Sequence, residues 1–370
     1  MKIYTSVIFV SLVATLLACG SGKSQKEQGS VVVMHSAETQ RLLSALKNIS
    51  SQGVMFGHHD DTNYGIGWEG EKGRSDVKSV CGDYPAVASF DLGGIELKDS
   101  MNLDKVPFSK IKKEILNQYL RGGLVTLSWH LRNPKTGGNA WDVSDATVVK
   151  SILPGGTAYP KFVGWLDGVA TFMNSLKTKA GTKIPVLFRP WHEHTGSWFW
   201  WGAELCTPAD YKMLWRITVD SLRAKGVDNV LYAYSTGTEP QDTAQYLERY
   251  PGDDLIDVIG FDNYQFKREN FLAAMQRELS IIDSIGRTHH KVIALTETGY
   301  EGIPDPEWWT KTLWPSIDKY PIAYLLVWRN AREKPTHFFA PYPGQVSASD
   351  FVKFYQIPKT LFAKDVNLYK

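Results

Sequence analysis

The alternation of strand-like and helix-like segments constrains this chain most. Short runs rich in β-branched and aromatic residues recur between residues 54 and 328, and longer segments with apolar residues at helical spacing separate most of them. This order is typical of parallel strands joined by helices. The strand-like runs begin at Val54, Pro85, Leu124, Ile184, Asn229, Leu255, Lys291 and Ile322.

Helix signals support the same order. Between residues 109 and 120 the apolar residues fall on one helical face, and Thr207 to Asp210 combines an N-cap threonine, a first-turn proline and an acidic third residue. We expect further helices at 160–178, 271–285, 306–318 and 350–363. The chain contains no GxxxxGK[ST] loop, which disfavours an open doubly wound sheet that binds phosphate. Eight strands therefore predict an α/β fold with a single closed (β/α)8 barrel, a TIM barrel, over residues 39–370.

Composition excludes several classes of protein. With 43% hydrophobic and 22% charged residues, the chain falls in the ordinary globular range. Its 41 basic and 39 acidic residues give a net charge of +2, so we expect no nucleic-acid partner. The 13 tryptophans exceed what a core usually needs and indicate a stacking surface. Cys81 and Cys206 are too few for a disulfide framework, and we expect both to be free thiols.

The first residues carry a separate signal. An apolar run from Ile3 to Ala18 follows Lys2, is too short for a dependable membrane span, and leads directly into Cys19. This pattern resembles a bacterial lipoprotein signal, which implies cleavage before Cys19 and lipidation of its thiol. Residues 1–18 are then the signal peptide and residues 19–38 a polar tether. A non-lipidated secretory signal is the alternative, and both interpretations export the protein.

The residues after Cys19 also bear on location. Some bacterial lipoproteins carry a cluster of acidic residues there that resembles a signal for export to the cell surface, and this chain lacks such a cluster. We therefore expect a lipid-anchored, monomeric protein of the bacterial cell envelope that faces the periplasm rather than the cell surface.

Two glutamates at predicted strand ends point to chemistry. Glu193 closes the fourth strand, which we expect to run from Ile184 to Glu193, and Glu297 closes the seventh. Barrel strands bring their carboxyl ends to one active-site face, and two carboxyl groups flanking a bond are what glycoside hydrolysis requires. A separation of about 5 Å would give retention through a covalent intermediate. Either glutamate alone is more often a cap or ion-pair partner, whereas a pair near several tryptophans favours catalysis.

Two other interpretations remain open at this stage. On a continuous strand His192 and His194 would point the same way and, with the His58-His59-Asp60 run, they suggest a metal-dependent barrel hydrolase. A non-catalytic glycan-binding lipoprotein would also explain the tryptophans and the anchor. That second interpretation does not require paired carboxylates.

Four motifs together carry a family resemblance. RPWHEHTGSWFWWG (residues 189–202), FDNYQ (261–265), LTETG (295–299) and WRN (328–330) resemble glycoside hydrolase family 26, mainly bacterial β-mannanases. The resemblance covers roughly residues 40–365. It implies a retaining hydrolase of β-1,4-mannosidic bonds in mannan, glucomannan, galactomannan and their oligosaccharides, without a metal or other cofactor. The same family includes members that act on mixed-linkage β-glucan or β-1,3-xylan.

The resemblance also implies roles for single residues. Glu193 matches the acid/base and Glu297 the nucleophile. Their tasks require Glu193 to stay protonated near neutral pH, which desolvation by indoles favours, and Glu297 to stay ionised, which hydrogen bonds favour. The remaining matches are residues that contact the sugar or the two glutamates, with Trp141 a looser match than the others: His130, Trp141, His192, Trp198, Tyr264, Trp328 and Arg329.

Overall fold

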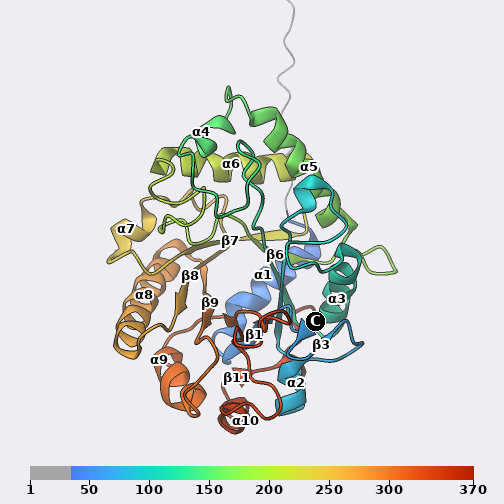
Figure 1. Cartoon of the computed structure of the whole chain (residues 1–370), viewed down its shortest axis with the longest axis vertical. Coiled ribbons are helices and arrows are strands. Elements are labelled where there is room, and N and C mark those ends of the chain that lie inside the picture. The colour runs from blue at the N-terminus through green and yellow to red at the C-terminus, as the bar shows by residue number, and fades with distance from the viewer. Residues whose placement is uncertain (1–34) are drawn as a thin grey trace, which may run out of the picture. The chain divides into compact units, whose positions relative to one another are not determined.

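Eight parallel strands close into a barrel in the computed structural model, which describes residues 35–370 apart from the side chain of Arg268 (Figure 1). The ring is closed by pairing between the first and last of these strands. The predicted α/β barrel is therefore confirmed. Its strands are β1 (Val54–His59), β4 (Val87–Asp91), β5 (Leu124–Ser128), β6 (Val186–Arg189), β7 (Val230–Thr236), β8 (Val258–Tyr264), β9 (Val292–Gly299) and β10 (Tyr324–Val327).

Helices surround the barrel largely where they were predicted. Thr207 caps the helix that follows it by accepting the backbone N–H of Asp210, as expected. The last predicted helix is shorter than expected, because it ends at Tyr355 rather than at residue 363. The outer helical segments are α3 (Phe108–Leu120), α5 (Tyr159–Ser175), α6 (Pro208–Ala224), α8 (Arg268–His289), the π-helix η2 (Trp309–Leu313) with α9 (Trp314–Ile317), and α10 (Ala348–Tyr355).

Shorter elements lie in the connections. A two-stranded antiparallel ribbon follows β1, and a final short strand pairs alongside β1. Cys81 and Cys206 are both free, as expected. These smaller elements are β2 (Tyr64–Gly65), β3 (Trp68–Glu69), α2 (Asp76–Cys81), η1 (Ile95–Leu97), α4 (Val148–Ser151), α7 (Thr243–Leu247), β11 (Thr360–Leu361) and η3 (Ala363–Asp365).

One long helix was not predicted. α1 (Ala37–Ile49) precedes the first strand, and Ser36 caps it by accepting the backbone N–H of Thr39. This helix begins two residues before the predicted domain boundary at residue 39. The predicted signal peptide, Cys19 and the tether up to residue 34 lie outside the described residues.

The two faces of each strand enter different clusters. On β9, Val292 and Ala294 pack in the cluster that also contains Leu42 and Leu46 of α1, whereas Ile293 and Leu295 pack in the cluster that contains the outer helices. Strand alternation thus directs every second side chain into the barrel. The same rule directs the last inward residue of each strand toward the face where the carboxyl ends meet.

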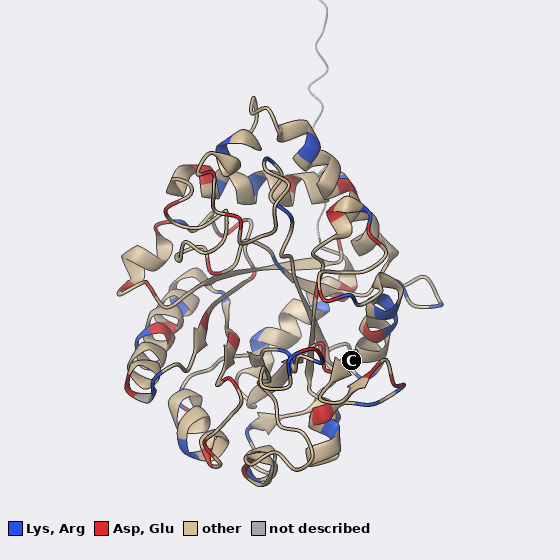
Figure 2. Cartoon of the chain, viewed as in Figure 1, with Lys and Arg blue, Asp and Glu red and all other residues tan. Residues whose placement is uncertain are grey.

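The outer surface of the barrel carries both signs of charge. Acidic and basic residues are both spread over the outer helices, consistent with the small net charge (Figure 2). Within residues 35–370, no helix has the length and apolar character needed to cross a membrane.

Candidate active site

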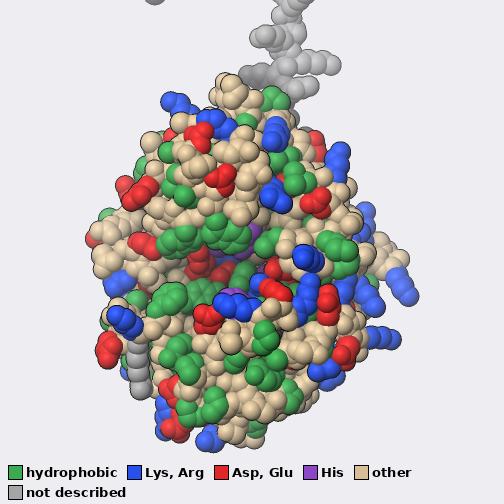
Figure 3. Space-filling view, in the orientation of Figure 1, with side chains coloured by type: hydrophobic (Ala, Val, Ile, Leu, Met, Phe, Trp, Pro, Cys, Tyr) green, Lys and Arg blue, Asp and Glu red, His purple; other side chains and the backbone are tan. Residues whose placement is uncertain are grey.

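A cleft crosses the carboxyl-end face of the barrel. The space-filling view shows acidic and histidine side chains in its floor and hydrophobic side chains along its rims (Figure 3). One half of the cleft has a volume of about 820 Å³ and is lined in part by Glu193, Trp198, Asp262, Tyr264 and Phe266. Both predicted strand-end motifs around Glu193 and Tyr264 therefore contribute to one cavity.

Glu193 lies in a turn, which corrects the predicted strand from Ile184 to Glu193. β6 ends at Arg189, and both Trp191 (φ 58°) and Glu193 (φ 52°) adopt the left-handed region that side chains other than glycine rarely occupy. Such backbone strain persists only where the surroundings impose it. The Glu193 N–H donates to the carbonyl of Ser235 at 3.1 Å, and the Tyr211 hydroxyl donates to the carbonyl of Trp191 at 2.7 Å. These contacts aim the Glu193 side chain into the cleft.

A bulge in β9 directs Glu297 inward. Phe261 of β8 pairs with Leu295, but the next residue, Asp262, pairs with Glu297, so Thr296 is an extra residue in β9. In a regular strand without the bulge, Glu297 lies two positions after Leu295 and would point toward the helices, as Leu295 does. Bulges of this kind commonly re-aim a side chain beside an active site.

The inward Glu297 carboxylate has two donors. The Tyr264 hydroxyl donates to its Oε2 at 2.7 Å, as the resemblance implies, and the Arg189 guanidinium forms an ion pair with its Oε1. Arg189 also donates to Asp262 Oδ2 at 2.8 Å. Neither Arg189 nor Asp262 was predicted as a site residue. The alternation of side chains along β6 and β8 does direct both of them into the barrel, and could have indicated them.

Three carboxyl groups converge at this point. Glu193, Asp262 and Glu297 each offer one oxygen, and these oxygens lie within 4.8 Å of one another. The spacing agrees with the predicted value of about 5 Å for a retaining pair. Burial and the neighbouring Asp262 and Glu297 charges raise the pKa of Glu193 well above its usual range. The Trp198 Nε1–H donates to Glu193 Oε2 at 2.7 Å and lowers this pKa in part. Glu193 therefore suits the acid and Glu297 the nucleophile.

His130 and His192 form a second buried group. Nδ1 of His130 lies 2.7 Å from Asp91 Oδ2, and its Nε2 lies 3.1 Å from His192 Nε2. Burial opposes a charge on His130, but the Asp91 carboxylate outweighs it and raises the His130 pKa. Burial lowers the pKa of His192 well below its usual value, and the charge on Arg189 adds to this effect. Asp91 is another residue that the sequence analysis did not select.

The other predicted sugar contacts lie around these histidines. Trp141, 48% exposed, stacks on His130 with ring centres 5.2 Å apart, and Trp328 stacks on His59 at 4.0 Å. Arg329 lies near Trp328 in the chain and pairs with Asp104 at 3.4 Å. The structure thus brings together all seven predicted binding residues on the face that carries Glu193 and Glu297.

The alternative interpretation, in which His192 and His194 share a metal ion, does not fit the structure. Because β6 ends at Arg189, His192 faces His130 while His194 packs between the rings of Tyr211 and Tyr234 at 4.3 and 4.7 Å. The two imidazoles are therefore not co-ligands.

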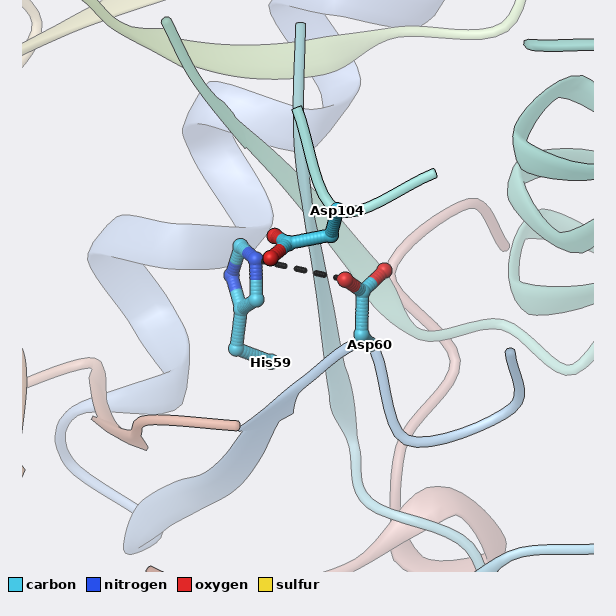
Figure 4. Close-up of side chains that lie close together, drawn as sticks. All are labelled: His59, Asp60 and Asp104. Carbon is cyan, nitrogen blue, oxygen red and sulfur yellow. Dashed lines mark ion pairs between the residues drawn. The ribbon is translucent and has the colours of Figure 1, made fainter. Parts of the chain in front are cut away.

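Another cluster lies beside Trp328. His59, Asp60 and Asp104 offer atoms within 4.8 Å of one another, and Nε2 of His59 lies 3.6 Å from Oδ2 of Asp60 (Figure 4). The Arg329 guanidinium already supplies positive charge to Asp104, which disfavours a second cation there. The cluster is better suited to hydrogen bonding of a polar ligand.

Comparison with known proteins agrees with this geometry. The profile of glycosyl hydrolase family 26 matches residues 31–335. The chain belongs to this family. It is 33% identical to a mannan endo-1,4-β-mannosidase from Bifidobacterium adolescentis over 94% of its own length, but it spans only 37% of that relative. A second curated relative, from Bacillus subtilis, is 28% identical over 77% of each chain.

Solved structures show the same barrel in family 26. A β-mannanase from Bacteroides ovatus is 62% identical, with a TM-score of 0.90 over 90% of this chain and 98% of that one. An endo-β-1,4-mannanase from Cellulomonas fimi is 36% identical, with a TM-score of 0.83 over 91% of this chain and 78% of that one.

Proposed function

We propose that this chain is a retaining β-mannanase that hydrolyses β-1,4-mannosidic bonds in mannan, glucomannan, galactomannan and their oligosaccharides. The observation that carries the proposal is the pair Glu193 and Glu297, with carboxyl oxygens within 4.8 Å in an open cleft. Such a separation suits direct attack by one carboxylate and leaves no room for an inverting water between them.

The first step forms a glycosyl–enzyme. Glu193 gives its proton to the glycosidic oxygen while an oxygen of Glu297 bonds to the anomeric carbon, and the bond between that carbon and the leaving oxygen breaks. Tyr264 and Arg189 hold Glu297 in position for this attack. The leaving sugar departs with the proton from Glu193.

The second step releases the sugar. Glu193, now a carboxylate, takes a proton from water while the water oxygen bonds to the anomeric carbon. The bond to Glu297 breaks, and both carboxyl groups return to their starting states. The raised pKa of Glu193 suits this exchange, since the group must be protonated in the first step and accept a proton in the second.

The preference for mannan is supported by the names of the relatives. The curated proteins from Bifidobacterium adolescentis and Bacillus subtilis are both mannan endo-1,4-β-mannosidases. Release of reducing ends from glucomannan and galactomannan, compared with mixed-linkage β-glucan and β-1,3-xylan, tests this preference. We expect the mannans to be cleaved fastest, and proton NMR to show the β-anomer as the first product. Faster cleavage of the glucan or xylan contradicts the substrate, and an α-anomer first contradicts retention.

A glycan-binding lipoprotein without activity is the second candidate. The exposed indoles of Trp141 and Trp198 favour glycan binding as such. The same hydrolysis assay separates the candidates, because a binding protein would retard mannan in affinity electrophoresis without releasing reducing ends.

We also propose that the mature protein is a monomer anchored through lipid on Cys19 and facing the periplasm. The Leu16-Leu17-Ala18-Cys19 sequence supports the anchor, and a doubly acylated residue gives stable membrane association. Cys19→Ala should move active protein into the soluble periplasmic fraction, and light scattering should give a single-chain mass. Protease added to intact cells should spare the native protein. Rapid cleavage would place it on the cell surface.

A further inference from the structure

The half of the cleft beyond Glu193 holds an aromatic ring with no role in the proposed reaction. We propose that Phe266 is an outer stacking platform for the leaving-group part of the substrate, a β-linked hexose beyond the unit next to the cleaved bond. The proposal rests on the proposed function. The family resemblance implies that His130, Trp328 and Arg329 contact the sugar on the non-reducing side of the cleaved bond. These residues do not line this half of the cleft, whereas Glu193 and Phe266 do.

Phe266 is held in the open by its neighbours. Its side chain is 89% exposed, although a phenylalanine gains free energy from burial. Gln265 donates its N–H to the carbonyl of Gly299 at 2.8 Å and accepts the Trp308 indole N–H at 2.7 Å, so it is anchored in the protein. Tyr264 is anchored to Glu297 in the cleft. Phe266, which follows Gln265 directly, is therefore left facing the cleft.

The surroundings of Phe266 are built for a sugar. Trp198, 41% exposed, contacts Glu193 directly, and Phe266 lines the same cavity without a hydrogen bond or ion pair to either glutamate. Pyranose rings have an apolar face that stacks on aromatic rings and hydroxyls that need polar partners. Glu239, Lys267 and Asn270 line the same cavity and offer such partners.

Another part of the cavity lining is fixed to α8, the helix that begins just after Phe266. Arg277 of α8 donates to the carbonyl of Thr238 at 2.7 Å and to that of Pro240 at 3.1 Å. The position of this segment relative to α8 is therefore set before a ligand arrives. A preformed groove with an apolar platform and a polar rim binds a sugar chain without ordering a loop.

The length dependence of cleavage tests the platform. The wild type and Phe266→Ala are compared on β-1,4-manno-oligosaccharides from mannotriose to mannohexaose. We expect the ratio of kcat/KM for mannohexaose to that for mannotriose to fall about three- to tenfold in Phe266→Ala, mainly through KM, because the outer sugar loses its stacking partner. Phe266→Tyr keeps a ring and should keep the wild-type ratio.

A control variant isolates the position of the ring. Leu120→Ala removes another highly exposed apolar side chain, from the last turn of α3, and should keep the wild-type ratio. An unchanged ratio in Phe266→Ala, or an equal fall in Leu120→Ala, overturns the platform. Light scattering provides a further test. If the wild type is a dimer and Phe266→Ala is a monomer, the ring serves self-association and the platform is overturned. If the wild type cleaves no mannoside, the proposed function itself fails.

Discussion

Nε2 of His130 lies 3.1 Å from Nε2 of His192, so one of these two nitrogens must donate and the other accept. Asp91 raises the pKa of His130, whereas burial lowers that of His192, and these opposite directions make His130 the donor. His192, adjacent to Glu193, is thereby held as a neutral ring with its proton on Nδ1.

Asp91→Asn should remove this ordering. The His130 contact lowers the pKa of Asp91 to about 2 despite its burial, so the carboxylate stabilises the fold above its unfolded pKa of 3.8 and loses that effect as pH falls through about 2. The variant should be destabilised by about 2 kcal/mol near neutral pH, and by progressively less in acid. Urea unfolding across this pH range is the measurement. A destabilisation that is independent of pH contradicts the ionic account.

Trp198→Phe should shift the alkaline limb of activity. Cleavage needs protonated Glu193, so activity falls as pH rises through the pKa of that group. The Trp198 indole N–H stabilises the Glu193 carboxylate, and its loss should raise this pKa and move the limb to higher pH. The pH profile of kcat/KM measures the shift, with Trp141→Phe as the matched indole that does not contact Glu193. A limb that moves to lower pH, or moves equally in both variants, is inconsistent with the assignment.

Glu297→Ala should abolish turnover without unfolding the protein. In the proposed mechanism its carboxylate forms the covalent bond, and the neighbouring Asp262 carboxylate is already held by Arg189. We expect less than about one per cent of wild-type activity even on an activated aryl β-mannoside. Thermal unfolding monitored by circular dichroism provides the folding control. Greater residual activity would show that Glu297 is not the nucleophile.

Glu193→Ala should separate substrates by their leaving groups. Natural mannans need protonation of the leaving oxygen and should be cleaved at least about a hundredfold more slowly. Aryl mannosides with acidic phenols need little protonation, so formation of the glycosyl–enzyme should be largely spared. Burst kinetics with a nitrophenyl mannoside measures this step. Equal losses on both substrate types would indicate a binding or folding role instead.

Chelation should leave activity unchanged. Two clusters of the described chain could hold an ion by spacing alone, one around Glu193 and one around His59, but Arg189 and Arg329 already supply positive charge to them. Dialysis against EDTA followed by a mannan assay is the measurement. Loss of activity that added metal restores would support the metal-dependent hydrolase.

The order of strands and helices in the barrel followed from local sequence alone. Hydrophobic periodicity located the eight strands, and helix signals such as Thr207 located most of the helices, because both depend on near neighbours in the chain. The helix at Ala37–Ile49 was missed, although its apolar residues Leu42 and Leu46 complete the barrel interior. The two glutamates and their partner Tyr264 were likewise visible in motifs at strand ends.

Tertiary structure decided how those residues point. Strict alternation would direct Glu297 toward the helices, and only the extra residue Thr296, seen in the pairing of β8 with β9, turns it into the cleft. The end of β6 at Arg189 separated His192 from His194 and removed the metal interpretation. The roles of Arg189 and Asp91 depend on charges that reach them from other strands. Register and long-range ion pairs arise from contacts between distant segments, which local sequence patterns do not encode.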